Sequence, residues 1–240
     1  MSIDWQDDRD IFGRMLVLTD NPIFNNLRNA IDNHDVDLSD ALSWGQLKSK
    51  RWLVEKLEEL DIPLGTIFLC AGWYGTLAAM LFQSKCSIDK IRSFDIDESC
   101  AEIADTINRK HVKNNYQFKA STLDIMNFEY SVAPAPSDGT IGNFYYNTIA
   151  SNKVIKMKDK PDTFINTSCE HIKNFTEWYD KIPDGRLVVL QSNNFFNVEE
   201  HVNCVRNPIE FASQSPMTDC LYTGVLELPK YNRFMRIGYK

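Results

Sequence analysis

The residues best suited to bind a small ligand follow three apolar runs of strand length. Gly72 and Gly75 come after the first run, and glycines there let a ligand approach the backbone closely. Asp95 ends the second run, 20 residues after Gly75, where a carboxylate can accept both ribose hydroxyls of an adenosine. Asp124 follows the third run and could meet the adenine amino group. The spacing therefore predicts a nucleoside-binding site.

Residues next to the glycine turn, Asp95 and Asp124, together with Ser168 after the fourth predicted strand, complete the predicted cofactor-binding site. The full set is Ala71, Gly72, Trp73, Tyr74, Gly75, Asp95, Ile96, Asp124, Ile125 and Ser168. Ile96 would press on the adenine face, and the side chains of Trp73 and Tyr74 are expected to be exposed. Each piece has a structural alternative. The glycines could form only a tight turn, Asp97 could cap the next helix, and Asp124 could be a solvated loop acid.

His171 has the chemistry of a general base, because imidazole titrates near neutrality, and it follows the fourth predicted strand. Glu170 could orient His171, or could simply favour the positive N-terminus of a helix. The alternative for His171 is a helix first-turn residue that bonds to the backbone. Asn193 and Asn194 follow the fifth predicted strand, where amides can bind a polar substrate, although an Asn-rich turn is the alternative.

The elements that must position these residues alternate between strand and helix patterns. Strands are predicted at 66–70, 91–95, 116–120, 163–166, 186–191, 221–228 and 231–239. Helices are predicted at 76–82, at 98–110 and from the end of the fourth strand through Trp178. Residues 131–150 are predicted to form a loop, and residues 198–211 a partly helical segment. This alternation predicts an α/β fold, a Rossmann-like three-layer sandwich. Its seven-stranded sheet is mostly parallel and ends in an antiparallel hairpin. Residues 1–60 are predicted to form a helical extension or lid over a core at 61–240.

The combination resembles the class I S-adenosylmethionine-dependent methyltransferases, over residues 60–240. Besides the glycine pair, Asp95 and Asp124, the resemblance is carried by the Glu-His-Ile at 170–172 and by the Pro-Asp-Gly-Arg-Leu-Val-Val-Leu at 183–190. These two segments are similar to the small-molecule branch, which includes the ubiquinone-biosynthesis O-methyltransferases. The resemblance implies an S-adenosylmethionine cofactor and methyl transfer to a small molecule.

The sequence departs from that family at two places. Leu69 and Cys70 stand where the first strand usually ends in an acid, and Ala71 and Trp73 replace glycines of the loop. In the ubiquinone branch, a glutamate three residues before the Glu-His pair helps to bind a divalent metal. Thr167 stands there in this chain, so no metal site is predicted.

The composition of the chain bears on which classes of macromolecule or membrane it could bind. The formal net charge of −7 gives no general attraction for nucleic acid or for an anionic membrane. Six widely spaced cysteines without a CxxC pattern, and no apolar run of membrane-spanning length, favour a reduced, cytoplasmic chain. The segment at 166–169 lacks the prolines of DNA adenine methyltransferases. A tRNA or other RNA acceptor stays open, and the sequence indicates no oligomeric state.

Two classes of function fit these residues. The first is a methyltransferase for an unidentified acceptor. The second is a nucleotide-binding Rossmann protein without methyl transfer, such as an NAD-dependent enzyme or a silent binding module. The Gly72 to Gly75 spacing lacks the G-x-G-x-x-G pattern that binds a pyrophosphate, and this favours the methyltransferase.

Overall fold

The computed structural model describes residues 22–34, 36–128, 144–150 and 153–240. The helices are α2 (Pro22–His34), α3 (Trp44–Leu60), α4 (Thr76–Leu81), α5 (Cys100–Ile107), α6 (Arg109–Lys113), α7 (Phe175–Lys181) and α8 (Pro208–Gln214), with 3-10 turns η1 (Ile125–Asn127) and η2 (Cys169–His171). The strands are β1 (Gly65–Cys70), β2 (Ile88–Asp95), β3 (Phe118–Thr122), β4 (Phe144–Ala150), β5 (Lys153–Asp159), β6 (Thr163–Asn166), β7 (Leu187–Asn193), β8 (Asp219–Glu227) and β9 (Asn232–Tyr239).

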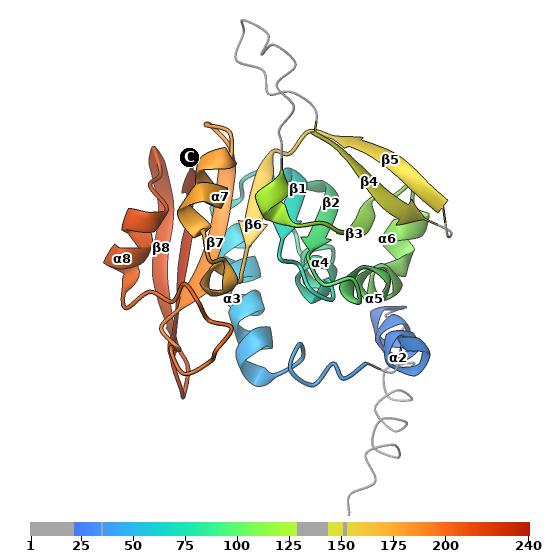
Figure 1. Cartoon of the computed structure of the whole chain (residues 1–240), viewed down its shortest axis with the longest axis horizontal. Coiled ribbons are helices and arrows are strands. Elements are labelled where there is room, and N and C mark those ends of the chain that lie inside the picture. The colour runs from blue at the N-terminus through green and yellow to red at the C-terminus, as the bar shows by residue number, and fades with distance from the viewer. Residues whose placement is uncertain (1–21, 35, 129–143, 151–152) are drawn as a thin grey trace, which may run out of the picture.

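Seven of these strands form one sheet in the order β3-β2-β1-β6-β7-β9-β8 (Figure 1). The first five pair in parallel, and β9 runs antiparallel to both β7 and β8. The predicted α/β fold, with its mostly parallel seven-stranded sheet and antiparallel C-terminal hairpin, is confirmed. Each helix in the described part of the chain is too short or too polar to span a lipid bilayer.

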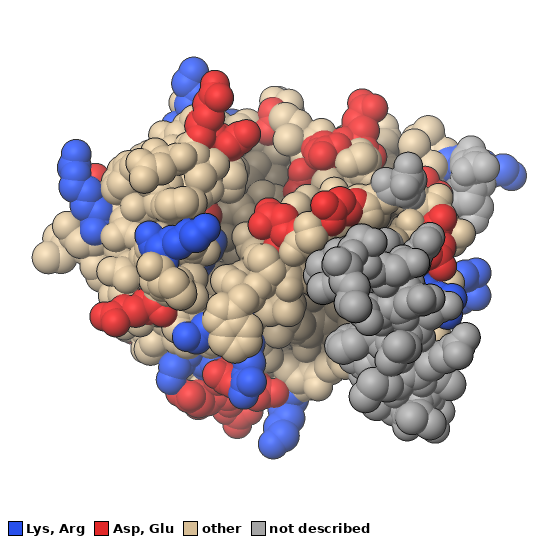
Figure 2. Space-filling model, turned by 90° about the horizontal axis from the view of Figure 1, so that it is seen from below, with Lys and Arg blue, Asp and Glu red and all other residues tan. Residues whose placement is uncertain are grey.

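The strand order reverses beside β1, which has β2 on one side and β6 on the other. In open α/β sheets, ligands bind beyond the carboxyl ends of the strands at such a reversal. Figure 2 looks onto that edge of the molecule and shows a hollow near its middle, flanked by acidic side chains. The segment that joins α2 to α3 runs along the same edge (Figure 1).

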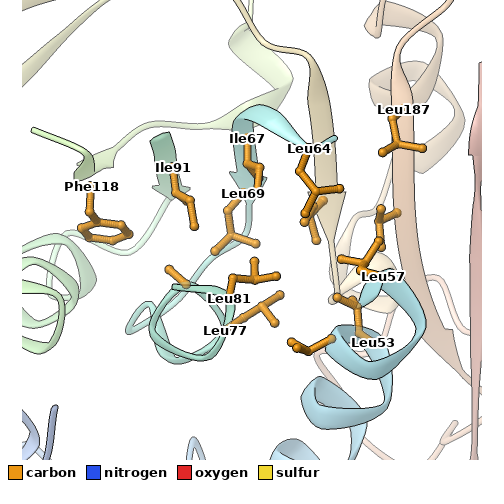
Figure 3. Close-up of a cluster of buried hydrophobic side chains, with 14 of the residues drawn as sticks. Leu53, Leu57, Leu64, Ile67, Leu69, Leu77, Leu81, Ile91, Phe118 and Leu187 are labelled. Carbon is orange, nitrogen blue, oxygen red and sulfur yellow. The ribbon is translucent and has the colours of Figure 1, made fainter. Parts of the chain in front are cut away.

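One face of the sheet is covered by α3, α4 and α5. Leu53 and Leu57 of α3 and Leu77 of α4 meet the inward side chains of the strands in a single aliphatic cluster (Figure 3). The helix α3 therefore packs in the same core as the residues that follow position 61. It begins where the Ser43 hydroxyl caps the backbone N–H of Gln46, and it ends at Asp61 in a left-handed conformation.

The opposite face is aromatic. Phe68 and Phe94 of the sheet pack edge-on, with ring centroids 5.1 Å apart, and Phe144 and Tyr146 of β4 cover them. The prediction of a loop up to 150 was wrong for residues 144–150, which pair with β5 as an antiparallel hairpin. Phe144, Tyr146 and Thr148 face the core while their neighbours face outward, as a half-buried strand requires.

Three boundaries also differ from the predictions. The third strand begins at Phe118, two residues later than expected. The helix expected over 98–110 is interrupted at Asn108, whose side chain donates hydrogen bonds to the carbonyls of Gly75 and Ala104. In the segment 198–211, only the part from Pro208 onward is helical, starting at the Asn207 cap.

Candidate functional site

The turn after β1 is held in a strained conformation. Ala71 and Trp73, on either side of Gly72, have φ angles of +53° and +49°, which side chains other than glycine rarely adopt. Such backbone strain persists where the surrounding structure imposes it, and it is common at ligand sites. A Cβ at Gly72 would collide with the Ser93 side chain, so this glycine lets the turn lie close against β2.

Asp95 connects that turn to the end of β2. Its Oδ2 accepts a hydrogen bond from the backbone N–H of Trp73 at 2.7 Å, and its Oδ1 accepts one from Asp97 at 3.1 Å. Partial burial raises the pKa of this carboxyl above 3.8, although hydrogen bonds from the backbone of Asp97, Trp73 and Ile96 oppose the shift. Each carboxylate oxygen keeps lone-pair capacity for a further donor, such as a ribose hydroxyl.

The other predicted adenosine contacts lie at the same edge. Ile96 is 69% exposed directly after Asp95, so its side chain is free to cover a flat ring. Asp124 caps the turn η1 by accepting the Met126 N–H at 2.8 Å, while Ile125 is buried in the aromatic cluster. The backbone N–H of Leu123 donates to the Asp95 carbonyl at 2.7 Å and thereby ties the two loops together.

The aromatic pair of the first loop is less exposed than expected. Trp73 and Tyr74 are partly buried and stack on each other, with centroids 4.9 Å apart. Tyr74 belongs to the apolar cluster that joins α2 and Leu38 to α4 and α5. Just after β6, the Ser168 N–H donates to the side-chain oxygen of Asn166, the last residue of that strand, and the chain turns toward residues 169–171.

Glu170 lies in a buried polar network rather than at the surface. Only 2% of it is exposed, and its Oε1 accepts hydrogen bonds from Asn193 Nδ2 at 2.6 Å and pairs with Arg233 Nη2 at 3.4 Å. Asn193 is itself buried, and its oxygen accepts the Phe195 N–H and the Cys204 thiol. The structure thus shows Asn193 holding Glu170 in place. Asn194 instead bonds to the backbone of Asn232 and joins β7 to β9.

His171 is exposed at the rim beside this network. Its Nδ1 bonds to the carbonyl of Glu200 at 3.1 Å, and no hydrogen bond joins its ring to Glu170. The ring of His201 packs edge-on against it, with centroids 4.7 Å apart. Sequence reasoning missed His201, which the structure places in a turn next to His171.

Lys50 is a second residue that sequence reasoning missed. It comes from α3, is 6% exposed, and donates to the Gln46 side chain at 2.6 Å. Burial, with a further contribution from Arg233, lowers the pKa of this amine to about 7. The helix α3 therefore adds an amine that interacts electrostatically with Arg233 and Glu170, the buried ion pair described above. Its only sequence signal was the small basic cluster with Lys48 and Arg51.

Comparison with known proteins identifies the fold. No protein-family model and no curated protein sequence matches this chain. Magnesium protoporphyrin IX methyltransferase from Synechocystis PCC 6803, solved with bound S-adenosylmethionine, is similar over 90% of both chains, with a TM-score of 0.54 and 12% identity. The N-methyltransferase NodS from Bradyrhizobium japonicum WM9, solved with S-adenosyl-L-homocysteine, matches over 92% of this chain and 99% of its own, with a TM-score of 0.56 and 8% identity. The small RNA methyltransferase HEN1 matches over 80% of this chain but 25% of its own, with a TM-score of 0.54 and 11% identity.

These likenesses, together with the strand order, define the fold as that of the class I S-adenosylmethionine-dependent methyltransferases. The predicted Rossmann-like fold is thereby confirmed. At identities of 8–12%, the acceptor and the activity of this chain do not follow from its neighbours.

Proposed function

We propose that this chain is an S-adenosylmethionine-dependent methyltransferase that acts on a small-molecule acceptor. The observation that carries the proposal is the contact between Asp95 and the strained turn after β1. A half-buried carboxylate at the end of β2, beside a turn without bulky side chains at 71 and 72, suits the ribose and methionine parts of this cofactor. Neighbours of the same fold were solved with S-adenosylmethionine or its demethylated product.

The proposed cofactor pocket runs along the edge from β1 to β3. Asp95 would accept the ribose hydroxyls, Ile96 would cover the adenine, and Asp124 would meet its amino group. Ala71, Gly72 and Ser168 would contact the methionine part through their backbone atoms. In this arrangement Gly75 has a supporting role, because its missing Cβ makes room for Asn108 and Ala104 of the neighbouring segment.

The acceptor would lie on the β6 and β7 side, next to His171. Methyl transfer from a sulfonium requires the nucleophile to be in line with the breaking bond, and proximity supplies much of the acceleration. His171 is exposed there, while Glu170 and Asn193 form the buried floor. We assign His171 to the acceptor half of the reaction and the segment between α2 and α3 to the lid.

Two measurements test this function. Calorimetry with S-adenosyl-L-homocysteine and with NAD separates a methyltransferase from other nucleotide-binding proteins, and we expect binding of the first only. A methyl-release assay over a panel of hydroxylated and aminated metabolites, with total tRNA as a further member, then tests the acceptor class. Turnover with tRNA alone would contradict the small-molecule assignment. Tight binding of S-adenosyl-L-homocysteine without turnover on any member of the panel would favour the alternative function, a cofactor-binding module without methyl transfer.

A further inference from the structure

Two buried cations and one buried carboxylate meet at the floor of the proposed acceptor side. Lys50 comes from α3, Arg233 from β9 and Glu170 from η2, and none of the three is more than 6% exposed. Arg233 Nη2 pairs with Glu170 Oε1 at 3.4 Å, so the negative charge of that carboxylate is already balanced. One buried positive charge therefore remains without a counter-ion.

Lys50 supplies this excess charge. Its Nζ donates to the Gln46 side chain at 2.6 Å and makes no ion pair within the described part of the chain. An ammonium group has three N–H donors, and this contact uses one of them. Burying a charge without a partner is costly in free energy. The amine is therefore suited to an anion that arrives with a ligand.

Arg233 leaves a second donor open in the same region. Its Nη1 donates to the carbonyl of Thr167 at 2.8 Å, and its Nη2 faces Glu170. The Nε atom is buried and has no hydrogen-bond partner among the residues that the structure describes. Buried polar atoms without a partner are rare in folded proteins, and each one calls for an explanation. The charge of Arg233 acts on the Lys50 amine, so the two residues lie near each other.

We propose that Lys50 and Arg233 bind a carboxylate group of the methyl acceptor, an inference that rests on the function proposed above. An excess of one positive charge suits a monoanion, and two carboxylate oxygens suit the ammonium of Lys50 and the Nε–H of Arg233. A phosphate monoester carries about two negative charges at neutral pH and exceeds this balance. Oxygens held by two cations are poor nucleophiles, so the methyl-accepting atom would lie elsewhere in the acceptor, beside His171.

Benzoate, benzamide and phenyl phosphate are suitable probes, because they share a ring and differ in the charge of the attached group. Each is titrated by calorimetry into the full-length chain, with and without S-adenosyl-L-homocysteine. Benzoate should bind about 10- to 100-fold more tightly than benzamide, as expected for hydrogen bonds to a charged group. It should also bind more tightly than phenyl phosphate.

Two lysine variants of α3 test the assignment. Lys50→Met should remove the preference for benzoate over benzamide. Lys48→Met makes the same change of charge on the same helix at a partly buried position, and it should keep the preference. Melting curves verify that both variants fold. Arg233 is left unchanged, because its removal would leave Glu170 buried without its ion pair.

Proton uptake gives an independent readout. Burial, with Arg233 nearby, lowers the pKa of Lys50 to about 7, while Asp40 and Glu170 act in the opposite direction. At pH 8 most of the amine is therefore neutral in the free chain. A bound carboxylate favours the ammonium form, so benzoate binding at pH 8 should take up close to one proton. Calorimetry in two buffers of different ionisation enthalpy measures this uptake, and benzamide or Lys50→Met should show none.

Several results would overturn the carboxylate site. They are no benzoate binding at millimolar concentration, equal affinities for benzoate and benzamide, tighter binding of phenyl phosphate, benzoate binding without proton uptake, and equal losses in the two lysine variants. Binding of S-adenosyl-L-homocysteine combined with any of these results rejects this site alone. A preference for benzoate that depends on Lys50, in a chain that does not bind S-adenosyl-L-homocysteine, rejects the proposed function alone.

Discussion

The Asp95 carboxylate accepts the backbone N–H of Trp73 at 2.7 Å and so fixes the turn after β1 against the end of β2. One side chain at the carboxyl end of β2 therefore shapes the loop that follows β1. The same relationship explains how the turn keeps positive φ angles at Ala71 and Trp73 without a glycine at either position. A residue placed in this way should affect cofactor binding more than its neighbours do.

Asp95→Ala should weaken S-adenosyl-L-homocysteine binding by about 1.5–3 kcal/mol, as expected for the loss of hydrogen bonds to a charged acceptor. Calorimetry measures the change. Asp97→Ala is the matched control, because Asp97 is an exposed acid two residues away whose carboxylate accepts the Ser99 N–H. Equal losses in the two variants would mean that the ribose lies elsewhere.

Cofactor affinity should fall on acidification, and the fall should begin above the ordinary aspartate pKa of 3.8. Burial raises the pKa of Asp95, so the folded chain binds this proton more tightly than the unfolded chain does. Ionised Asp95 thus costs stability above its folded-state pKa, and that cost disappears below 3.8. The ribose hydroxyls need the ionised form. Titrations from pH 7 down to the lowest pH at which the chain stays folded should show the loss in the unmodified chain and a flatter profile in Asp95→Asn. Parallel profiles would contradict the assignment.

A side chain at position 75 should destabilise the fold itself. Gly75 has a φ of +69°, and an added Cβ would lie 2.8 Å from Asn108 Nδ2 and 3.1 Å from the Ala104 Cβ. Gly185 has a similar φ of +75°, with no atom within 4 Å of an added Cβ. Both alanine variants bear the left-handed backbone cost of about 1–2 kcal/mol. Gly75→Ala should lose a further 1–3 kcal/mol or so from overpacking, measured by urea unfolding. Equal losses of unfolding free energy in Gly75→Ala and Gly185→Ala would show that α5 shifts away from the added methyl group at little cost.

The sequence predicted the seven-stranded sheet well because its central strands are buried on both faces and appear as continuous apolar runs, such as residues 66–70 and 187–190. The hairpin β4–β5 escaped prediction, since its core-facing Phe144 and Tyr146 alternate with polar residues next to a segment rich in proline and glycine. A tertiary ion pair holds the hairpin against the sheet, since Asp159 of β5 pairs with Arg92 of β2 at 2.7 Å.

At the candidate site, the residues that directly follow strands could be placed from sequence, because every parallel strand ends at the same edge. His201 and Lys50 could not. His201 is brought beside His171 by an irregular segment that the sequence pattern made partly helical. Lys50 lies in a charged stretch of α3 that looks solvent-exposed, and only the packing of α3 against β7 and β9 buries it.

Lys50→Met should stabilise the protein, and the gain should depend on pH. Burial, with Arg233 nearby, lowers the pKa of Lys50 to about 7 in the folded chain, against 10.5 for the unconstrained amine. Below pH 7 both states carry the charge, so the folded chain bears the full cost of burying it. Between pH 7 and 10.5 the folded chain is deprotonated first, and this cost shrinks as the pH rises. Urea unfolding at pH 6 should show a gain of about 3–5 kcal/mol, which follows from the size of the pKa shift. At pH 10 most of that gain should be gone.

Lys48→Met, on the same helix and only partly buried, is the control for losing a lysine. A gain in Lys50→Met that is the same at both pH values would mean that the amine stays charged, held by Asp40 and Glu170 against the effect of burial.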